Sequence, residues 1–297
     1  MLRFVKDWTL PVAMFLGILG HSLFSQLTFL TPYLIFAMLL LTFSNIPPAE
    51  MRIRPLHLWL LSIQILGSLL IYLLMFRFDK IVAEGALICI MAPTATSAAV
   101  ITHKLGGSAA SVTVYTLLGN LGLALAAPLV FPLIETRAGM SFINSSLLVM
   151  GKVFPLLIFP FLLALLLRRF TPEVSRKLRS WQEGAFYLWA FALMIVTAQI
   201  LESFMDNPRG FRTKFLTCAV SLAVCLLQFF VGRKIGGRYG DKVSGGQALG
   251  QKNTVLAIWL TVTYLDPLAA IGPGFYVLWQ NVVNSWQLWR KRSLPPI

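Results

Sequence analysis

Short polar breaks divide this sequence into apolar runs long enough to cross a membrane, and these runs constrain the fold more than any other feature. A membrane-spanning helix needs ~20 mainly apolar residues, because its backbone must satisfy its own hydrogen bonds in lipid. Only 12% of the residues are charged, whereas a soluble domain carries roughly 25%. So little charge cannot cover a water-facing surface for a chain of 297 residues. The sequence therefore predicts an all-α polytopic membrane protein embedded in a lipid bilayer.

The apolar runs between polar breaks predict ten spans in one integral membrane unit, residues 1–297. The breaks at Ser25-Gln26 and Asp266-Pro267 are each only two residues long. Ten spans divide into two five-helix repeats, 1–134 and 147–289, and an odd number of spans per half gives the halves opposite orientations, as in inverted repeats. The predicted spans are 8–25, 28–46, 56–76, 83–102, 108–134, 147–167, 182–203, 213–231, 246–265 and 267–289.

The distribution of basic residues predicts the orientation of these spans. With the N-terminus inside, the inside segments carry seventeen Lys and Arg residues and the outside segments carry six. This asymmetry predicts an inner (plasma) membrane protein with both termini in the cytoplasm. The net charge of +14 is spread over short gaps between apolar runs rather than clustered on one face, so it does not indicate nucleic-acid binding. Arg3 and Lys6 precede an apolar run without a small-x-small cleavage site, which predicts a retained first span rather than a signal peptide.

A polar, helix-breaking segment recurs in the fourth predicted span of each half. The first is residues 92–97, where Pro93 is followed by hydroxyl side chains, and the second is the glycine- and amide-rich segment 245–254. Paired interruptions at matching places indicate a binding site near the middle of the membrane. The alternative for the first segment is a plain proline kink whose hydroxyls bond back to the helix. The candidate site residues in these segments are Pro93, Thr96, Ser97, Gln247, Gln251, Asn253 and Thr254.

Lys252 is the ionisable residue that most strongly suggests a function. It lies inside the second polar segment, and a lysine at membrane depth costs ~3 kcal/mol by insertion scales. The alternative is that its long side chain reaches the cytoplasmic interface. Lys152 lies near the start of the sixth span, and we interpret it as a side chain that reaches the adjacent membrane interface. Gln64 is a lone amide within the third span and is typical of a binding residue or of an interhelical hydrogen bond.

The acidic residues offer no clear cation site, because none of the eleven lies in the middle of an apolar run and Glu84 falls near a span end. Na⁺ or H⁺ coupling usually requires a carboxylate at membrane depth. A membrane enzyme would need paired carboxylates, a metal-ligand set or a nucleophile with its base. No such set is recognisable, and His21, His57 and His103 have no partner spacing. We therefore expect no enzyme activity, no metal and no cofactor.

At this point the chain resembles the bile acid:sodium symporter family, as a divergent member of prokaryotic type. The likeness follows nearly the whole chain in span order. Gln64 matches a glutamine in the family's third span, and Ser111 lies in the matched start of its fifth. The most specific match consists of three segments in order. They are a glycine-x-glutamine-asparagine segment, a proline-leucine-alanine-alanine turn and a final tryptophan-x-asparagine motif that ends at Asn281. The matched segments are 250–254, 265–270, 277–281, 96–100 and 111–114.

This resemblance implies ten helices in two inverted five-helix repeats, with helices four and nine broken and crossing at the binding site. It also implies a panel of spans 1, 2, 6 and 7 beside a core of spans 3–5 and 8–10. Its implied activity is uptake of an organic anion together with Na⁺.

Several departures from the family pattern affect the implied sodium sites. Members that use sodium carry a glutamate two residues before the glycine matched by Gly250, where this chain has Ala248. The family's glutamine two residues after that glycine is Lys252 here, its serine-asparagine pair is Ala98-Ala99, and a hydroxyl of span five is Tyr115. These changes predict that the sodium sites are dismantled and that a fixed ammonium replaces a bound cation.

These features predict a secondary-active transporter that moves a small organic anion, such as a carboxylate, by alternating access without Na⁺. Lys252 would supply a positive charge at the crossing of the two broken spans, and a proton is the other candidate coupling ion. One alternative is an Na⁺-coupled symporter with an oxygen site built from Gln64, Ser111, Gln247 and Gln251. Another is a membrane receptor that binds a ligand without moving it.

Overall fold

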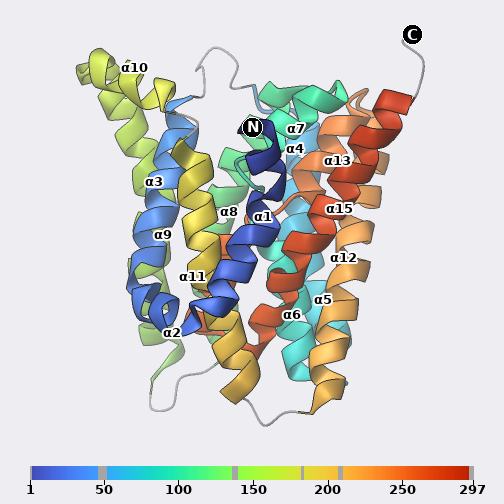
Figure 1. Cartoon of the computed structure of the whole chain (residues 1–297). Coiled ribbons are helices and arrows are strands. Elements are labelled where there is room, and N and C mark those ends of the chain that lie inside the picture. The colour runs from blue at the N-terminus through green and yellow to red at the C-terminus, as the bar shows by residue number, and fades with distance from the viewer. Residues whose placement is uncertain (1, 46–51, 136–139, 182–183, 207–209, 294–297) are drawn as a thin grey trace.

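The computed structural model describes residues 2–45, 52–135, 140–181, 184–206 and 210–293, and these residues are mainly helical, without a named strand (Figure 1). The first half contains α1 (Leu2–Leu19), α2 (His21–Phe24), η1 (Ser25–Leu30), α3 (Thr31–Ser44), α4 (Pro55–Ser62), the π-helical turn η3 (Ile63–Gly67), α5 (Ser68–Met75), α6 (Lys80–Met91), α7 (Ala98–Leu105) and α8 (Ala109–Ile134). The second half contains α9 (Phe142–Phe170), α10 (Pro172–Ser180), α11 (Gly184–Asp206), α12 (Phe211–Arg238), α13 (Lys242–Gly250), α14 (Thr254–Tyr264), η4 (Pro267–Ala270) and α15 (Ile271–Ser293). Four charged residues of the predicted loops and span ends, Glu50, Arg137, Glu183 and Arg209, lie outside the described residues.

Six helices in the described ranges are long and apolar enough to span a bilayer. Their outer faces carry large exposed apolar side chains, among them Leu125, Leu133 and Phe159. Such a surface is stable in lipid and not in water. These helices identify the chain as an integral membrane protein, and they are 21–44, 55–75, 109–134, 142–170, 184–205 and 211–238.

The helices gather into two groups that Figure 1 shows side by side. One group contains α1, α3, α9 and α11, which pack against one another. The other contains α4 to α7 and α12 to α15. The long helix α8 joins them, because it packs on α9 from the first group and on α4 and α7 from the second.

The first predicted break is wrong in position. The α-helix α1 ends at Leu19 and a turn follows at Gly20, whereas Ser25-Gln26 lies inside the helical run from His21 to Ser44. The run changes from α-helix to the 3-10 helix η1 at Ser25, and the Gln26 side-chain amide bonds the Ser22 carbonyl one turn back, at 3.0 Å. A polar pair therefore does not interrupt a helix when its hydrogen bonds can be satisfied locally.

Glycines allow α12 and α13 to pack backbone against backbone. A Cβ atom added to Gly232 would lie 2.3 Å from the carbonyl oxygen of Gly245, and one added to Gly245 would lie 2.8 Å from the Cα of Gly236. Only residues without a side chain permit this approach. The glycine-rich run at 245–250, which the sequence predicted to be a break, is therefore helical, and the helix ends just after it.

Candidate functional site

The first interruption separates α6 from α7 at residues 92–97, as Pro93 predicted. A proline has no backbone N–H to donate to the carbonyl four residues earlier, which here belongs to Cys89. The amide of Gln228 in α12 donates to that Cys89 oxygen instead, at 3.1 Å. The last carbonyls of any helix lack partners within it, so the end of α6 needs donors from other elements.

Lys252 supplies two of these donors. Its Nζ donates to the carbonyl oxygens of Ile90 at 2.7 Å and of Ala92 at 2.9 Å. The side chain is 1% exposed, and no carboxylate pairs with it in the described part of the chain. An ammonium at a helix C-terminus also interacts favourably with the negative end of the helix dipole. Lys252 therefore points into the protein and caps a broken helix, rather than reaching a membrane interface.

Gln64 completes this cap from the π-helical turn η3. Its Nε2 donates to the carbonyl oxygen of Met91 at 2.9 Å, while its Oε1 accepts a hydrogen bond from the Tyr115 hydroxyl at 2.7 Å. Gln64 is fully buried. A π-turn shifts the side chains that follow it by one position, and such turns are frequent at functional sites. Two amides and one ammonium thus hold the carbonyl end of α6.

The second interruption, residues 251–253, is built in the same way and lies against the first. Thr94 and Lys252 form an antiparallel bridge. The Ala95 N–H donates to the Gln251 carbonyl at 3.0 Å, and the Asn253 N–H donates to the Pro93 carbonyl at 2.8 Å. The predicted interruption of both helices and the contact between them are therefore confirmed.

Side chains also satisfy the carbonyl end of α13. The Thr94 hydroxyl donates to the Ala248 carbonyl at 2.6 Å, and the Tyr276 hydroxyl donates to the Gly250 carbonyl at 2.8 Å. Gln280 bonds both the backbone N–H and the carbonyl of Lys252, at 2.7 and 3.3 Å. Each interruption is thus a fixed structure with defined hydrogen-bond partners.

The polar surface of the crossing comes from other residues. Ser97 is exposed, and Thr96 and Asn253 are half-buried. The Ser97 hydroxyl accepts a hydrogen bond from the amide of the buried Gln251 at 2.9 Å, and the Asn253 side chain caps α14 through the Leu256 N–H at 3.2 Å. These hydroxyl and amide groups form the accessible side of the site.

The remaining candidates lie in different surroundings. Gln247 donates to Asn284 and Gln287 of α15, both at 3.1 Å, and the buried Thr254 begins α14. The Asn281 amide bonds the Val277 carbonyl one turn back within α15, at 2.6 Å. Within the tryptophan-x-asparagine motif at 279–281, the neighbouring Gln280 is the residue that reaches the crossing.

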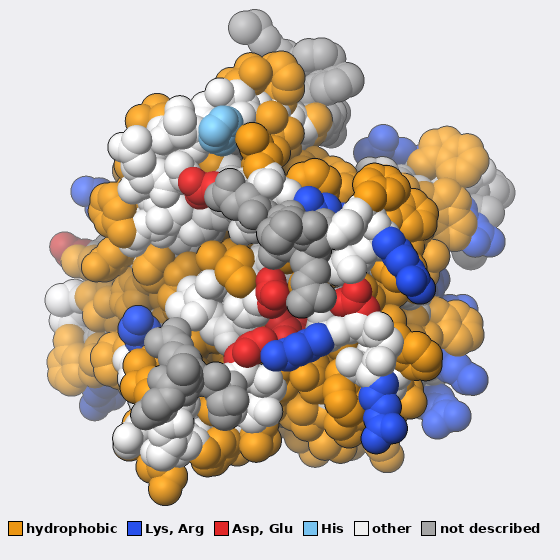
Figure 2. Space-filling model, turned by 90° about the horizontal axis from the view of Figure 1, so that it is seen from below, with side chains coloured by type: hydrophobic (Ala, Val, Ile, Leu, Met, Phe, Trp, Pro, Cys, Tyr) orange, Lys and Arg blue, Asp and Glu red, His pale blue; other side chains and the backbone are white. Residues whose placement is uncertain are grey.

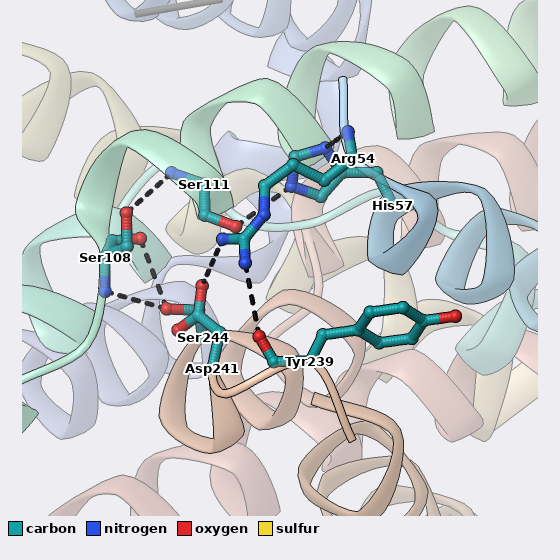
Figure 3. Close-up of polar contacts among 7 residues, drawn as sticks. All are labelled: Arg54, His57, Ser108, Ser111, Tyr239, Asp241 and Ser244. Carbon is teal, nitrogen blue, oxygen red and sulfur yellow. Dashed lines mark hydrogen bonds and ion pairs between the residues drawn. The ribbon is translucent and has the colours of Figure 1, made fainter. Parts of the chain in front are cut away.

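Ser111 lies in a separate polar group, where the first residues of α4, α8 and α13 meet (Figure 3). The Arg54 guanidinium pairs with Asp241 at 3.3 Å. His57 Nε2 lies 2.9 Å from the Ser111 hydroxyl, and His57 is 1% exposed. His57, for which the sequence showed no partner spacing, thus pairs with Ser111 at the ends of two helices, because residues 54 positions apart in the sequence meet where these helices begin together.

The tautomer of His57 excludes base catalysis by this pair. The backbone N–H of Arg54 donates to His57 Nδ1 at 3.2 Å. The proton must then be on Nε2, which donates to the Ser111 oxygen and cannot remove its proton.

The four oxygen-bearing residues considered for a sodium site also have separate partners, since Ser111 binds His57 and Gln64 Oε1 binds Tyr115.

Sequence reasoning missed three residues of the crossing and one buried acid. Gln228, Tyr276 and Gln280 hold the broken ends, and Glu84 is 0% exposed although its position suggested a span end. A lone glutamine in the apolar run of α12 was the available signal for Gln228, and it is the same signal that identified Gln64. The burial of Glu84 depends on packing against the turn at Asp266, whose N–H it accepts at 2.8 Å.

Removing the Tyr115 hydroxyl should destabilise the protein. Tyr115→Phe leaves Gln64 Oε1 buried without its donor, at a cost of about 1–3 kcal/mol. We expect a lower unfolding temperature in detergent. Tyr187→Phe is the control, since Tyr187 is 56% exposed on α11. Equal unfolding temperatures for the two variants would show that Tyr115 is not needed to hold Gln64.

No model of a known protein family matches the chain, and no curated protein matches it.

Proposed function

We propose that this protein is a secondary transporter of a small organic anion, with the fold of the bile acid:sodium symporter family and no requirement for Na⁺. The observation that carries the proposal is the position of the Lys252 ammonium, which lies on two backbone carbonyl oxygens where a helix is broken. Unwound backbone carbonyls within a membrane are the groups that coordinate Na⁺ in transporters. A covalently attached cation already occupies them here.

The arrangement of the two interruptions supports ten spans in two inverted repeats. In each half a short helix, a break and a second short helix precede a long helix, as α6, α7 and α8 do in the first half and α13, α14 and α15 in the second. The two breaks pair antiparallel, which is the relation expected of inverted repeats. The excess of basic residues in the inside segments supports a cytoplasmic location for both termini, which corresponds to the upper side of Figure 1, where α15 ends.

The site favours an anion with hydrogen-bonding oxygens. The accessible groups are the Thr96 and Ser97 hydroxyls and the Asn253 amide, and the buried Lys252 directly precedes Asn253 in the chain. A positive charge in a low-dielectric region attracts an anion without touching it. Transport is favoured over passive binding because the site lies between interrupted helices, as in alternating-access proteins.

The proposal is tested by uptake into proteoliposomes. The probes are cholate, benzoate and pyruvate, which represent steroid, aromatic and aliphatic carboxylates, each measured in Na⁺, K⁺ and choline media. We expect uptake of at least one anion at the same rate in all three media.

Two other results would contradict the proposal in different ways. Uptake that increases steeply with Na⁺ alone would show that a sodium site persists. If one of the anions raises the unfolding temperature but is not taken up, the protein binds the anion as a receptor and does not transport it.

A further inference from the structure

A wholly buried carboxylate lies in α6, far from the crossing end of that helix. Glu84 is 0% exposed, and its Oε2 accepts the N–H of Asp266 at 2.8 Å. Its Oε1 accepts no hydrogen bond from the described residues and lies 3.7 Å from the Lys80 ammonium. A buried carboxylate with so few partners is costly while it is charged. One oxygen of Glu84 is thus available to hold a proton.

Lys80 connects this buried carboxylate with the surface. Its Nζ also bonds Glu135 Oε1, and the Lys80 and Glu135 side chains are 47% and 33% exposed. Figure 2, seen from below, shows acidic side chains gathered near the middle of this face with a basic side chain beside them. Two carboxylates share one ammonium, so the group is one positive charge short of neutrality.

A small cavity beside Glu135 provides an independent indication of a water path. It has a volume of about 10 Å³, and its polar lining is Glu135, Ser145 and Tyr264. The Ser145 hydroxyl is 4% exposed and has no hydrogen-bond partner among the described residues. A cavity of this size holds about one water molecule. Such a water would satisfy Ser145 and lie next to the Glu135 carboxylate.

We propose that Glu84 is a proton-binding site, reached from the lower face through Glu135 and a water molecule held by Ser145. An O–H bond forms at Glu84 Oε1, and the proton comes from solvent by way of the Glu135 carboxylate. The ligand is a proton rather than a metal ion because the Lys80 ammonium already lies next to both carboxylates. The cavity is also too small for a hydrated ion.

The charged and titratable groups around Glu84 come from each neighbouring element. The Asp79 carboxylate is held by the first N–H groups of α6 and by the Thr213 hydroxyl, and the Asp266 carboxylate accepts the Leu268 N–H. These acids have hydrogen-bond donors of their own, whereas Glu84 Oε1 has none among the described residues, so Glu84 is the group proposed to accept a proton. Among the described residues the charged and titratable groups are Asp79 just before α6, Lys80 on α6, Tyr72 on α5, Glu135 after α8, Tyr264 on α14 and Asp266 before η4.

The same short helix connects this proton site with the crossing. Glu84 precedes Ile90, whose carbonyl binds Lys252, by six residues, or about 9 Å along the helix axis. Its bond to Asp266 also ties α6 to the end of α14. This coupling role rests on the proposed transport function, in which the proton would be the ion that moves with the anion.

Infrared spectroscopy of the purified protein tests the proton site without any transport. A protonated carboxyl has its own C=O band, which we expect to disappear between acid and alkaline pH in the wild type. Glu84→Gln should lack this band, whereas Glu173→Gln, which changes an exposed acid on α10, should retain it. An unchanged titrating band in Glu84→Gln would overturn the proposal.

Two further variants examine the path to Glu84. Glu135→Gln removes a neighbouring negative charge, so the band should titrate at lower pH. Ser145→Ala should keep the band. The shift of the band that accompanies exchange of the carboxyl proton for deuterium in D₂O should become slower, because the bound water loses a hydrogen-bond partner. If neither variant changes the band or its exchange, the path from the lower face is wrong.

Uptake into proteoliposomes tests the coupling. With acid on the side of the lower face, one coupled proton drives roughly tenfold accumulation per pH unit, and Glu84→Gln should lose all of it while Glu173→Gln keeps it. A titrating Glu84 band without anion uptake would refute the proposed function and support the proton site. Anion uptake that ignores the pH gradient would refute the coupling and leave the proposed function supported.

Discussion

Lys252→Ala should unfold at a much lower temperature than the wild type and should be stabilised by Na⁺. The substitution removes both donors to the Ile90 and Ala92 carbonyls, and two hydrogen bonds from a charged group contribute roughly 3–6 kcal/mol. For a chain of this size the unfolding midpoint should fall on the order of 10 °C. The freed carbonyls then resemble the oxygen ligands of a transporter sodium site. Added NaCl, compared with choline chloride, should recover part of the loss.

The control for this experiment is Lys152→Ala. Lys152 is also on a predicted span, but its side chain is exposed on α9, so its removal should change the midpoint little. Lys252→Gln replaces the ammonium with an uncharged amide donor, and its unfolding midpoint should lie between those of the two alanine variants. If Lys252→Ala unfolds at the same temperature as Lys152→Ala, the ammonium does not hold the interruption in place. The proposal that Lys252 replaces a bound sodium ion then loses its support.

Gly245→Ala should disrupt the packing of α13 on α12. The new Cβ would lie 2.4 Å from the Gly232 carbonyl oxygen and 2.8 Å from the Gly236 Cα. Both are backbone atoms that cannot rotate away, so the helices must separate. Overpacking of this kind costs about 1–3 kcal/mol or more, and α13 carries Gln251 into the crossing. We expect a clear fall in the unfolding temperature and weaker anion binding.

Gly237→Ala is the matched control, because it introduces the same side chain at a position of α12 where the new Cβ would meet no atom within 4 Å beyond its own turn of helix. An exposed alanine should be neutral or stabilise the helix by up to about 1 kcal/mol. Thermal unfolding of both variants in the same detergent gives the comparison. Equal stability would mean that α12 and α13 tolerate separation and that the close glycine contact has no role.

The sequence was sufficient to predict an all-helical membrane chain and both interruptions. Pro93 lacks a backbone donor and Lys252 is conspicuous in an apolar run, and both are local features. What could not be predicted is the direction of each side chain. The carbonyls that Lys252 binds belong to residues about 160 positions earlier, so its partner depends on how α6 and the second interruption meet.

The same limit explains the other differences. Glu84 is buried by the turn at Asp266, and His57 meets Ser111 only because α4 and α8 begin side by side. The turn at Gly20 was missed because the more polar Ser25-Gln26 satisfies its hydrogen bonds within the helical run. Periodicity and polarity therefore identify where a helix is interrupted more reliably than they identify what holds the interruption.

The reciprocal capping of the two interruptions also determines the order in which the chain can be assembled. The carbonyl end of α6 depends on Gln228 and Lys252, whereas that of α13 depends on Thr94. During synthesis the first interruption therefore enters the bilayer more than 100 residues before its main donors exist. Exposed carbonyls are costly in lipid, so the first half must wait in water-filled surroundings or beside an insertion partner. Biogenesis of this chain is thus expected to complete its core only after the second half has been released from the ribosome.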